Sequence, residues 1–251
     1  MNEPTSPIGA VVAAMQERLD GLPAAKRSRA VFLETYSRTT SAVAGAIEQG
    51  VFEDGPWVER WDVAFADLYL AALDADLAGG PGVPRPWRLA FDAPPDLPAL
   101  RHVLLGINAH INYDLPQALL RVISDADFAD AAVLGRRRGD HERIDAVLSG
   151  RVADEDDELA ATSGRTLLDR ALQPLNRLAS KRFLREARQK VWHNTEELQR
   201  ARLDGDAAYG VRLGELELLS AAKIADLLAP GQVLLRLAVA GFGVVLPPPR
   251  S

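Results

Sequence analysis

The amino-acid sequence predicts an all-α fold, a single-domain multi-helix bundle around one buried central helix. Three observations lead to this prediction. Alanine and leucine dominate nearly every periodic segment, apolar residues recur at helical spacing, and alternating runs of β-branched residues are scarce. The chain has 251 residues, of which 47% are hydrophobic, enough for a substantial core. We therefore expect one all-α domain over residues 1–251, with frayed ends at about 1–7 and 247–251.

Helical periodicity, glycine and proline set the expected boundaries of the elements. A helix should end near Gly50, and Pro56 should open the next one because proline suits the first helical turn. The segment from Gly79 to Pro98 is rich in glycine and proline, which predicts a long loop. Asp140 suits the N-cap of a short helix. The expected helices are residues 8–19, 24–49, 56–77, 97–123, 141–148, an interrupted pair within 157–203, 211–228 and 232–241. The remaining connections are expected as loops at residues 124–139, 149–156 and 204–210.

The expected central helix, residues 97–123, contains the most informative stretch of the chain. Five polar side chains fall within seven positions of an otherwise apolar pattern, namely Asn108, His110, Asn112, Tyr113 and Asp114. Burying such groups is unfavourable unless each finds a partner, so packing alone rarely selects them. His110 and Asp114 share one face of a helix with Gly106, because the three residues are spaced four apart.

Two residues beside this polar stretch indicate an unusual backbone. Gly106 would let another backbone or a ligand approach the helix closely, because glycine has no Cβ atom. Pro116 removes one helical hydrogen bond and can kink the helix. A buried helix that combines a glycine, a polar stripe and a kink could form the wall of a cavity.

The pair His110 and Asp114 admits three interpretations. Asp114 could orient the imidazole and raise its basicity for acid–base catalysis. Both residues could bind a divalent metal together with Asp62, since imidazole and carboxylate ligands suit zinc, iron or manganese. Alternatively, the two side chains satisfy each other within a polar core, as structural ion pairs do. The residue pattern leaves all three interpretations open.

Other residues could complete a site around this pair. Asp62 lies in the apolar helix expected at 56–77 and could be a second acid–base group. Tyr69 lies seven residues later on the same face. On a later helix, an inward-facing arginine could pair with Asp114 or bind an anionic substrate group. The residues expected to bind the substrate are Asn108, Tyr69, Trp61, Arg188 and Trp192.

Composition disfavours several classes of function. The formal net charge of −6 argues against a non-specific nucleic-acid binder, because phosphate contacts need clustered positive charge. The compact basic run of Arg136, Arg137 and Arg138 is explained by a solvated loop. The chain has no cysteine, which excludes disulfides and thiolate metal sites. No phosphate-binding glycine loop, dinucleotide fingerprint or serine-hydrolase elbow occurs in the sequence.

The sequence also sets an expected location and expected partners. The N-terminus lacks the pattern of a signal peptide, and the apolar stretch at 232–246 is too short and broken for a membrane span. We expect a soluble cytoplasmic protein whose partner is a small-molecule ligand, without nucleic acid or membrane. No cofactor is expected, a divalent metal being the alternative. The sequence specifies no oligomeric state.

Three segments of the chain together carry a family resemblance. They are Trp61–Tyr69 (WDVAFADLY), Leu105–Pro116 (LGINAHINYDLP) and Asp140–Asp145 (DHERID). They resemble an uncharacterised bacterial family, catalogued as domain of unknown function 5995, over roughly residues 31–192. That family typically has an aromatic residue and an asparagine where His141 and Asp145 stand here. The resemblance implies a helical fold with Asn108, His110 and Asp114 at its centre, and it implies no activity.

We therefore expect a small-molecule enzyme with an internal, mostly apolar cavity. His110 would be the general acid or base, Asp114 its orienting partner and Asp62 a second acid–base group. The reaction would be a cyclisation, an isomerisation or a hydrolysis driven by proton transfer. One alternative is a metal-dependent hydrolase or oxygenase that uses the same three residues as ligands. Another is a non-catalytic ligand-binding or interaction module.

Overall fold

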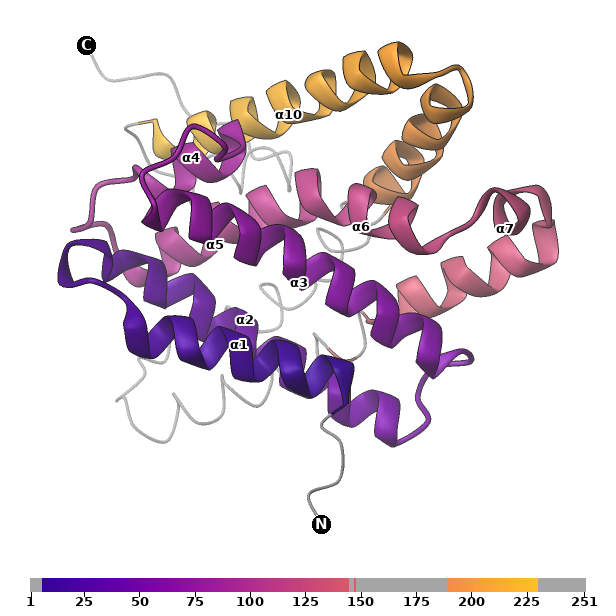
Figure 1. Ribbon diagram of the computed structural model, residues 1–251, viewed down its shortest axis with the longest axis horizontal. Helices are drawn as coiled ribbons and strands as arrows, with labels where there is room; N and C mark the ends of the chain where they lie inside the picture. Colours follow the sequence, from indigo (N-terminus) through magenta and orange to yellow (C-terminus); the bar gives the residue numbers. More distant parts are fainter. Residues whose placement is uncertain (1–5, 145–146, 148–188, 230–251) are drawn as a thin grey trace, which may run out of the picture.

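The computed structural model describes residues 6–144, 147 and 189–229, and every regular element within them is helical (Figure 1). The labelled helices are α1 (Pro7–Gly21), η1 (Ala24–Lys26), α2 (Ser28–Glu48), α3 (Gly55–Leu77), α4 (Arg85–Phe91), α5 (Ala99–Ala109), η2 (His110–Asp114), α6 (Leu115–Val122), α7 (Asp125–Ala129) and α10 (Asp206–Leu228). Residues 131–144 and 189–203 are also helical. The predicted all-α fold class is confirmed.

The helices pack around the segment formed by α5, η2 and α6. Helices α1 and α2 form an antiparallel hairpin, and α10 runs along α4 on the far side of the molecule (Figure 1). The central segment contacts α2, α3, α4 and α10. Residues on this segment can therefore meet side chains from helices that are distant in the sequence.

The apolar core consists of two large clusters that both reach α3. Leu33 and Trp87 belong to the cluster beside α5, and Trp57 and Leu119 belong to the cluster beside α6. Phe65 of α3 packs against both clusters. Burying each such large apolar side chain contributes about 1.5–3 kcal/mol to folding. Both clusters that pack against the central segment therefore contain residues of α3.

The ends of α2 and α3 follow the sequence rules closely. Asp54 caps α3, since its Oδ1 accepts a hydrogen bond from the backbone N–H of Trp57 at 3.0 Å, and Pro56 lies in the first turn. Gly50, just after α2, has a φ of 69°, and Gly79, just after α3, has a φ of 66°. Such positive φ angles favour glycine. The predicted boundaries at Gly50 and Pro56 are confirmed to within two residues.

The central helix changes its hydrogen-bonding pattern at the polar stretch. At residues 110–114 the backbone forms a π-helical turn, in which the N–H of Leu115 bonds to the carbonyl of His110, five residues back. Pro116 has no N–H, so an uninterrupted α-helix would leave the carbonyl of Asn112 without a donor. The wider turn lies just before this proline and shifts the register of the hydrogen bonds. The irregularity expected from Pro116 is therefore a π-turn that contains His110 and Asp114.

The prediction of one long loop between Gly79 and Pro98 is wrong. This segment contains α4, which has Pro86 in its first turn and buries Trp87 and Phe91. Proline breaks the interior of a helix but favours its first turn, so the same residue type predicts either outcome. Burial of Trp87 in the core favours the helix α4 over a loop.

The prediction of a loop at residues 124–139 is also wrong. Helix α7 and the helix at 131–144 occupy it, so Asp140 lies within a helix instead of capping one. Arg137 is not a solvated loop residue: its guanidinium lies 4.9 Å from the centroid of the Trp57 ring and pairs with Asp54. Arg136 and Arg138 remain half exposed. Helical spacing therefore directs one arginine of the basic run inward.

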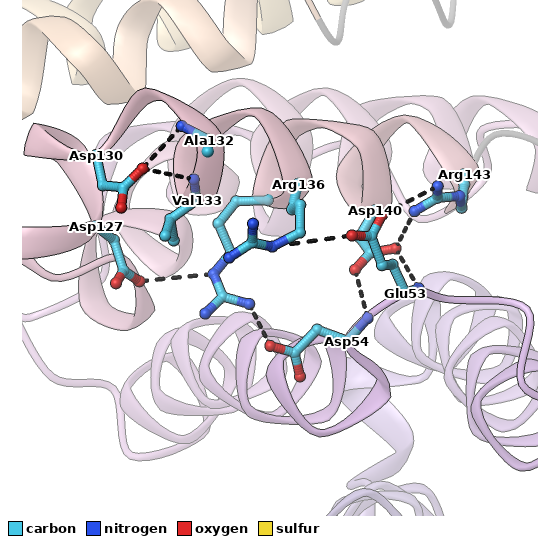
Figure 2. A network of polar contacts seen from close by, with 10 residues as sticks. Glu53, Asp54, Asp127, Asp130, Ala132, Val133, Arg136, Asp140 and Arg143 are labelled. Carbon is cyan, nitrogen blue, oxygen red and sulfur yellow. Dashed lines mark hydrogen bonds and ion pairs between the residues drawn. The ribbon is translucent and has the colours of Figure 1, made fainter.

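The buried carboxylate of Asp140 ties this helix to the start of α3. Its Oδ1 accepts a hydrogen bond from the backbone N–H of Glu53 at 2.8 Å, and its Oδ2 accepts one from Asp54 at 2.9 Å. Arg143 donates to Oδ1 at 2.5 Å and completes the network (Figure 2). Unpaired backbone N–H groups are costly to bury, so this carboxylate satisfies the turn that precedes α3.

Several predictions fall at or beyond the described residues. Pro7, expected in a frayed end, is the first residue of α1. Helix α10 includes the predicted helix at 211–228 and begins five residues earlier, at Asp206. Of the pair expected within 157–203, only the helix at 189–203 is described, and the helix expected at 232–241 lies outside the described residues. Within residues 6–144 and 189–229, no helix is both long and apolar enough to cross a membrane.

We predict that Asp140→Ala destabilises the protein by about 2–4 kcal/mol, because it leaves the N–H groups of Glu53 and Asp54 without their charged acceptor. The control is Glu142→Ala on the same helix, which removes an exposed ion pair with Arg138 and should cost less than about 0.5 kcal/mol. Urea unfolding of both variants measures the difference. Equal stability losses would contradict the role assigned to Asp140.

Candidate active site

The structure brings His110 and Asp114 together as a buried pair. The Nδ1 atom of His110 lies 2.9 Å from the Oδ2 atom of Asp114, and the two residues are only 3% and 1% exposed. The indole Nε1–H of Trp87 donates a second hydrogen bond to the same Oδ2, at 2.7 Å. The π-turn supplies both members of the pair, and α4 supplies the tryptophan that fixes the carboxyl group.

Aromatic rings enclose the imidazole of His110. The Phe65 ring stacks on it with a centroid distance of 3.5 Å and an interplanar angle of 6°, and the Tyr36 ring meets it edge-on at 4.5 Å. Three further ring centroids lie within 6.0 Å of it, those of Phe32, Tyr69 and Trp87. These five rings are called the aromatic box below. Within the described residues, the buried Nε2 atom of His110 makes no hydrogen bond.

The environment of the pair disfavours charge on either partner. Burial lowers the pKa of His110 well below its usual value. Burial also raises the pKa of Asp114 well above its usual value, while the hydrogen bond from Trp87 and the charge of Arg121 oppose that rise. Near neutral pH the pair therefore carries no net charge and holds one proton between Nδ1 and Oδ2. Nε2 is the remaining nitrogen that can exchange a proton with a ligand.

Asp62 is a second buried carboxyl group on the neighbouring helix α3. It is 7% exposed, and its Oδ2 makes no hydrogen bond within the described residues. Burial raises its pKa to about 7. Burial likewise raises the pKa of Tyr36, and the charges of Asp62 and Asp114 raise it further. Tyr36 thus lies within electrostatic reach of both carboxyl groups, and its ring contacts His110.

The other sequence-predicted site residues divide between two places. Tyr69 belongs to the aromatic box, and its buried hydroxyl has no hydrogen-bond partner among the described residues. Asn108 is engaged along its own helix: it donates to the carbonyl of Leu104 at 2.8 Å and accepts from Asn112 at 3.2 Å. Trp61 and Trp192 lie on either side of His141 instead, with ring centroids 5.4 and 5.6 Å from it. Arg188 lies outside the described residues.

The contacts that sequence reasoning missed are mostly aromatic. The loop predicted between Gly79 and Pro98 includes Trp87, although the Arg-Pro-Trp order around Pro86 is also typical of a helix start. Phe32, Tyr36 and Phe65 follow helical spacing, which indicates packing against other helices but no particular partner. Their contact with His110 joins α2 and α3 to the central segment, and no local spacing specifies that contact.

The alternative hypothesis is a metal site formed by His110, Asp114 and Asp62, and the described part of the chain shows no such cluster of ligands. Within residues 6–144, 147 and 189–229, no three histidine, aspartate or glutamate side chains gather as a metal site requires. Asp114 Oδ2 already interacts with both His110 and Trp87. The charges of Asp62 and Asp114 both act on Tyr36, whose ring contacts His110.

A small pocket adjoins the aromatic box. Its volume is about 20 Å³, and residues around it include Arg29, Phe32, Trp87, Phe91, His102 and Gly106. This volume suits a water molecule and is too small for a typical ligand. A Cβ atom on Gly106 would lie 2.3 Å from the Cδ2 atom of Phe32. Gly106 therefore admits an aromatic ring, rather than another backbone or a ligand, and that ring lines the pocket and belongs to the aromatic box.

The comparisons with known proteins place the chain in one family. Residues 8–230 match the model of a family of unknown function, DUF5995, and the chain belongs to this family. The match confirms the resemblance carried by the three sequence segments, and it includes His110, Asp114 and Asp62. No curated protein and no solved structure matches the chain. The function must therefore be argued from the site itself.

We predict that Gly106→Ala destabilises the protein by about 1–3 kcal/mol, because the new methyl group must push the buried Phe32 ring aside. The control is Gly214→Ala in α10, where nothing lies within 4 Å of the added carbon. There the loss of glycine flexibility should stabilise the helix by about 0.5–1 kcal/mol. Opposite signs in thermal and urea unfolding would support the close contact, and two stabilising substitutions would contradict it.

We predict that Asp62→Asn changes how stability depends on pH. The folded protein keeps a proton on Asp62 that the unfolded chain loses above pH 3.8, so stability falls as the pH rises from about 4 to 7. Each pH unit in this window contributes about 1.4 kcal/mol, a loss of up to about 4 kcal/mol that the asparagine variant avoids.

Urea unfolding between pH 4 and 8 measures this effect, with Asp67→Asn as the control because Asp67 is exposed on the same helix. Relative to wild type, Asp62→Asn should gain stability as the pH rises, whereas Asp67→Asn should run parallel to wild type. A parallel curve for Asp62→Asn would show that its carboxyl group ionises normally.

Proposed function

We propose that this protein is a small-molecule enzyme in which His110 and Asp114 act as an acid–base pair. One observation carries the proposal. The imidazole is fixed at Nδ1 by a buried carboxyl group that Trp87 also holds, while Nε2 makes no hydrogen bond among the described residues. A core that only needed a filled space would gain nothing from a histidine with one unsatisfied nitrogen.

The arrangement supports proton transfer to and from a bound molecule. A substrate proton would pass to or from Nε2, and Asp114 would compensate by shifting the shared proton at Nδ1. The ring faces that the aromatic box turns toward His110, such as that of Phe65, would stabilise an imidazolium that forms during the reaction, as cation–π contacts do. Such positioned acid–base groups typically contribute 10²–10⁴-fold to a rate.

Asp62 and Tyr69 supply further groups for the same chemistry. With a pKa of about 7, Asp62 can either donate or accept a proton near neutral pH. The unbonded hydroxyl of Tyr69 can bind a substrate oxygen. These groups suit an isomerisation, a cyclisation or a hydrolysis of a mostly apolar molecule.

Access to Nε2 requires a side chain to move. His110 is 3% exposed, and the Phe32 ring both lines the adjoining pocket and has its centroid 6.0 Å from that of the imidazole. Rotation of Phe32 away from Gly106 would join the pocket to the box. The substrate would then replace the aromatic contacts that the ring gives up, so binding and opening are coupled.

The second candidate is a non-catalytic role in which the pair holds the core together. The close stacking of Phe65 on His110 at 3.5 Å and the small pocket favour it. In that case the pair would contribute to stability and to the choice of one packing arrangement, without proton exchange to a ligand.

The test compares wild type with His110→Gln and with His193→Gln, whose histidine is exposed. Each protein is incubated in D₂O with a library of small, mostly apolar molecules, and deuterium uptake or product formation is followed by mass spectrometry. We expect wild type and His193→Gln to act on the same compound, and His110→Gln to act at least 10²-fold more slowly.

Melting temperatures of the three proteins separate catalysis from folding. A His110→Gln variant that melts normally but loses turnover supports the enzyme. Equal turnover by His110→Gln and wild type would overturn the assignment of the base. A loss of melting temperature without any turnover by wild type would favour the structural role.

A further inference from the structure

We propose that the pocket beside the aromatic box binds the carboxylate end of an apolar carboxylic acid. This pocket is called the Arg29 pocket and is defined by Ser28, Arg29, Phe32, Trp87, Phe91 and His102. The statement that this acid is the substrate rests on the proposed function, whereas the binding of a carboxylate does not.

Charge is the first argument for a carboxylate. The Arg29 side chain is only 10% exposed, and its Nε lies 3.2 Å from the Oδ2 of Asp76. Lys26 binds the same oxygen at 2.9 Å, so two cations share one carboxylate. This leaves a positive charge that an anionic ligand can neutralise at the pocket. Arg29 also donates from Nη2 to the Oδ1 of Asp76 at 3.4 Å and from Nη1 to Ser28, and the remaining N–H groups of its guanidinium can donate to a ligand carboxylate.

His102 is the second polar group of the pocket. It is 8% exposed, and its Nε2 makes no hydrogen bond among the described residues. A buried imidazole nitrogen without a partner is unfavourable, and a ligand oxygen would satisfy it. Ser28 adds a hydroxyl that already interacts with Arg29 at 3.3 Å. Three side chains of different types thus offer hydrogen-bond donors at one small cavity.

The pocket and the acid–base pair lie along one face of the central helix. His102, Gly106 and His110 follow at steps of four residues, so the two histidines are separated by about 12 Å along the axis. Phe32 and Trp87 both line the pocket and belong to the aromatic box, and Phe32 packs on Gly106, so the pocket adjoins the box directly. Burial raises the pKa of Tyr69, and the charge of Arg29 opposes that rise.

The walls define the rest of the ligand. Phe32, Trp87 and Phe91 line the pocket with aromatic rings, and Phe65 and Tyr36 continue this lining around His110. A molecule with a carboxylate at Arg29 and an apolar body that displaces Phe32 would present its far end to Nε2. The volume of about 20 Å³ suits the carboxylate group alone, before Phe32 moves.

The experiment measures the binding of hexanoate to the full chain by calorimetry, with hexanamide as the uncharged isostere and inorganic phosphate as the alternative anion. We expect hexanoate to bind at least tenfold more tightly than hexanamide and than phosphate. We expect Arg29→Gln to weaken hexanoate binding at least tenfold and His102→Gln to weaken it several-fold. Arg27→Gln should leave it unchanged, because Arg27 is exposed two residues before Arg29.

Two comparisons keep the outcome decisive. A wild-type protein that binds hexanoate with this pattern but turns over no compound of the library would sink the proposed function and leave this inference standing. Equal affinity for hexanoate and hexanamide, no binding of either, or an unchanged affinity in Arg29→Gln would overturn the carboxylate site. Tighter binding of phosphate than of hexanoate would overturn the ligand class. The comparison of ligands on wild type decides the matter even where Arg29→Gln fails to fold.

Discussion

The hydrogen bond from Trp87 to the buried carboxyl group of Asp114 is the interaction on which the candidate site depends. A carboxyl group at 1% exposure needs partners, and here its Oδ2 meets both the indole N–H and the imidazole of His110. The indole is available only because α4 packs against α5 and places the ring in the core. Without this contact, the apolar surroundings would leave a buried acid with one partner fewer, at a cost of about 1–3 kcal/mol.

The surroundings of this pair determine what it can do. Aromatic rings from α2, α3 and α4 exclude water and disfavour a permanent charge, yet they can stabilise a cation that forms transiently on His110. Burial also desolvates the carboxyl group of Asp62, and the charge of this group acts on Tyr36. Groups with displaced pKa values in a common apolar environment are a recurrent feature of acid–base sites, and they also occur in structural networks. The unsatisfied Nε2 atom favours the first of these.

A second polar network supports the site from a distance. Asp140 fixes the turn before α3, and Asp54 caps that helix while it pairs with Arg137 (Figure 2). Helix α3 then carries Asp62, Phe65 and Tyr69 to the centre of the molecule. The charged groups at the start of α3 therefore help to position the aromatic box, although none of them touches His110. The third family segment contributes here to scaffolding, through Asp140 and Arg143.

The helical class, the end of α2 and the start of α3 can be predicted from the sequence, because they follow from local spacing, capping and glycine geometry. The stripe that joins Gly106, His110 and Asp114 can also be predicted, because residues four apart share one face of a helix. Only the tertiary structure decided that Trp87 meets Asp114, that the aromatic rings enclose His110, and that Trp61 and Trp192 gather around His141 instead. It also showed that Gly106 receives the Phe32 ring, and that within residues 6–144, 147 and 189–229 no three acidic or histidine side chains gather as a metal site. The physical reason is that periodicity reports which face of a helix is buried, whereas the partner of that face is chosen by packing between helices far apart in the chain.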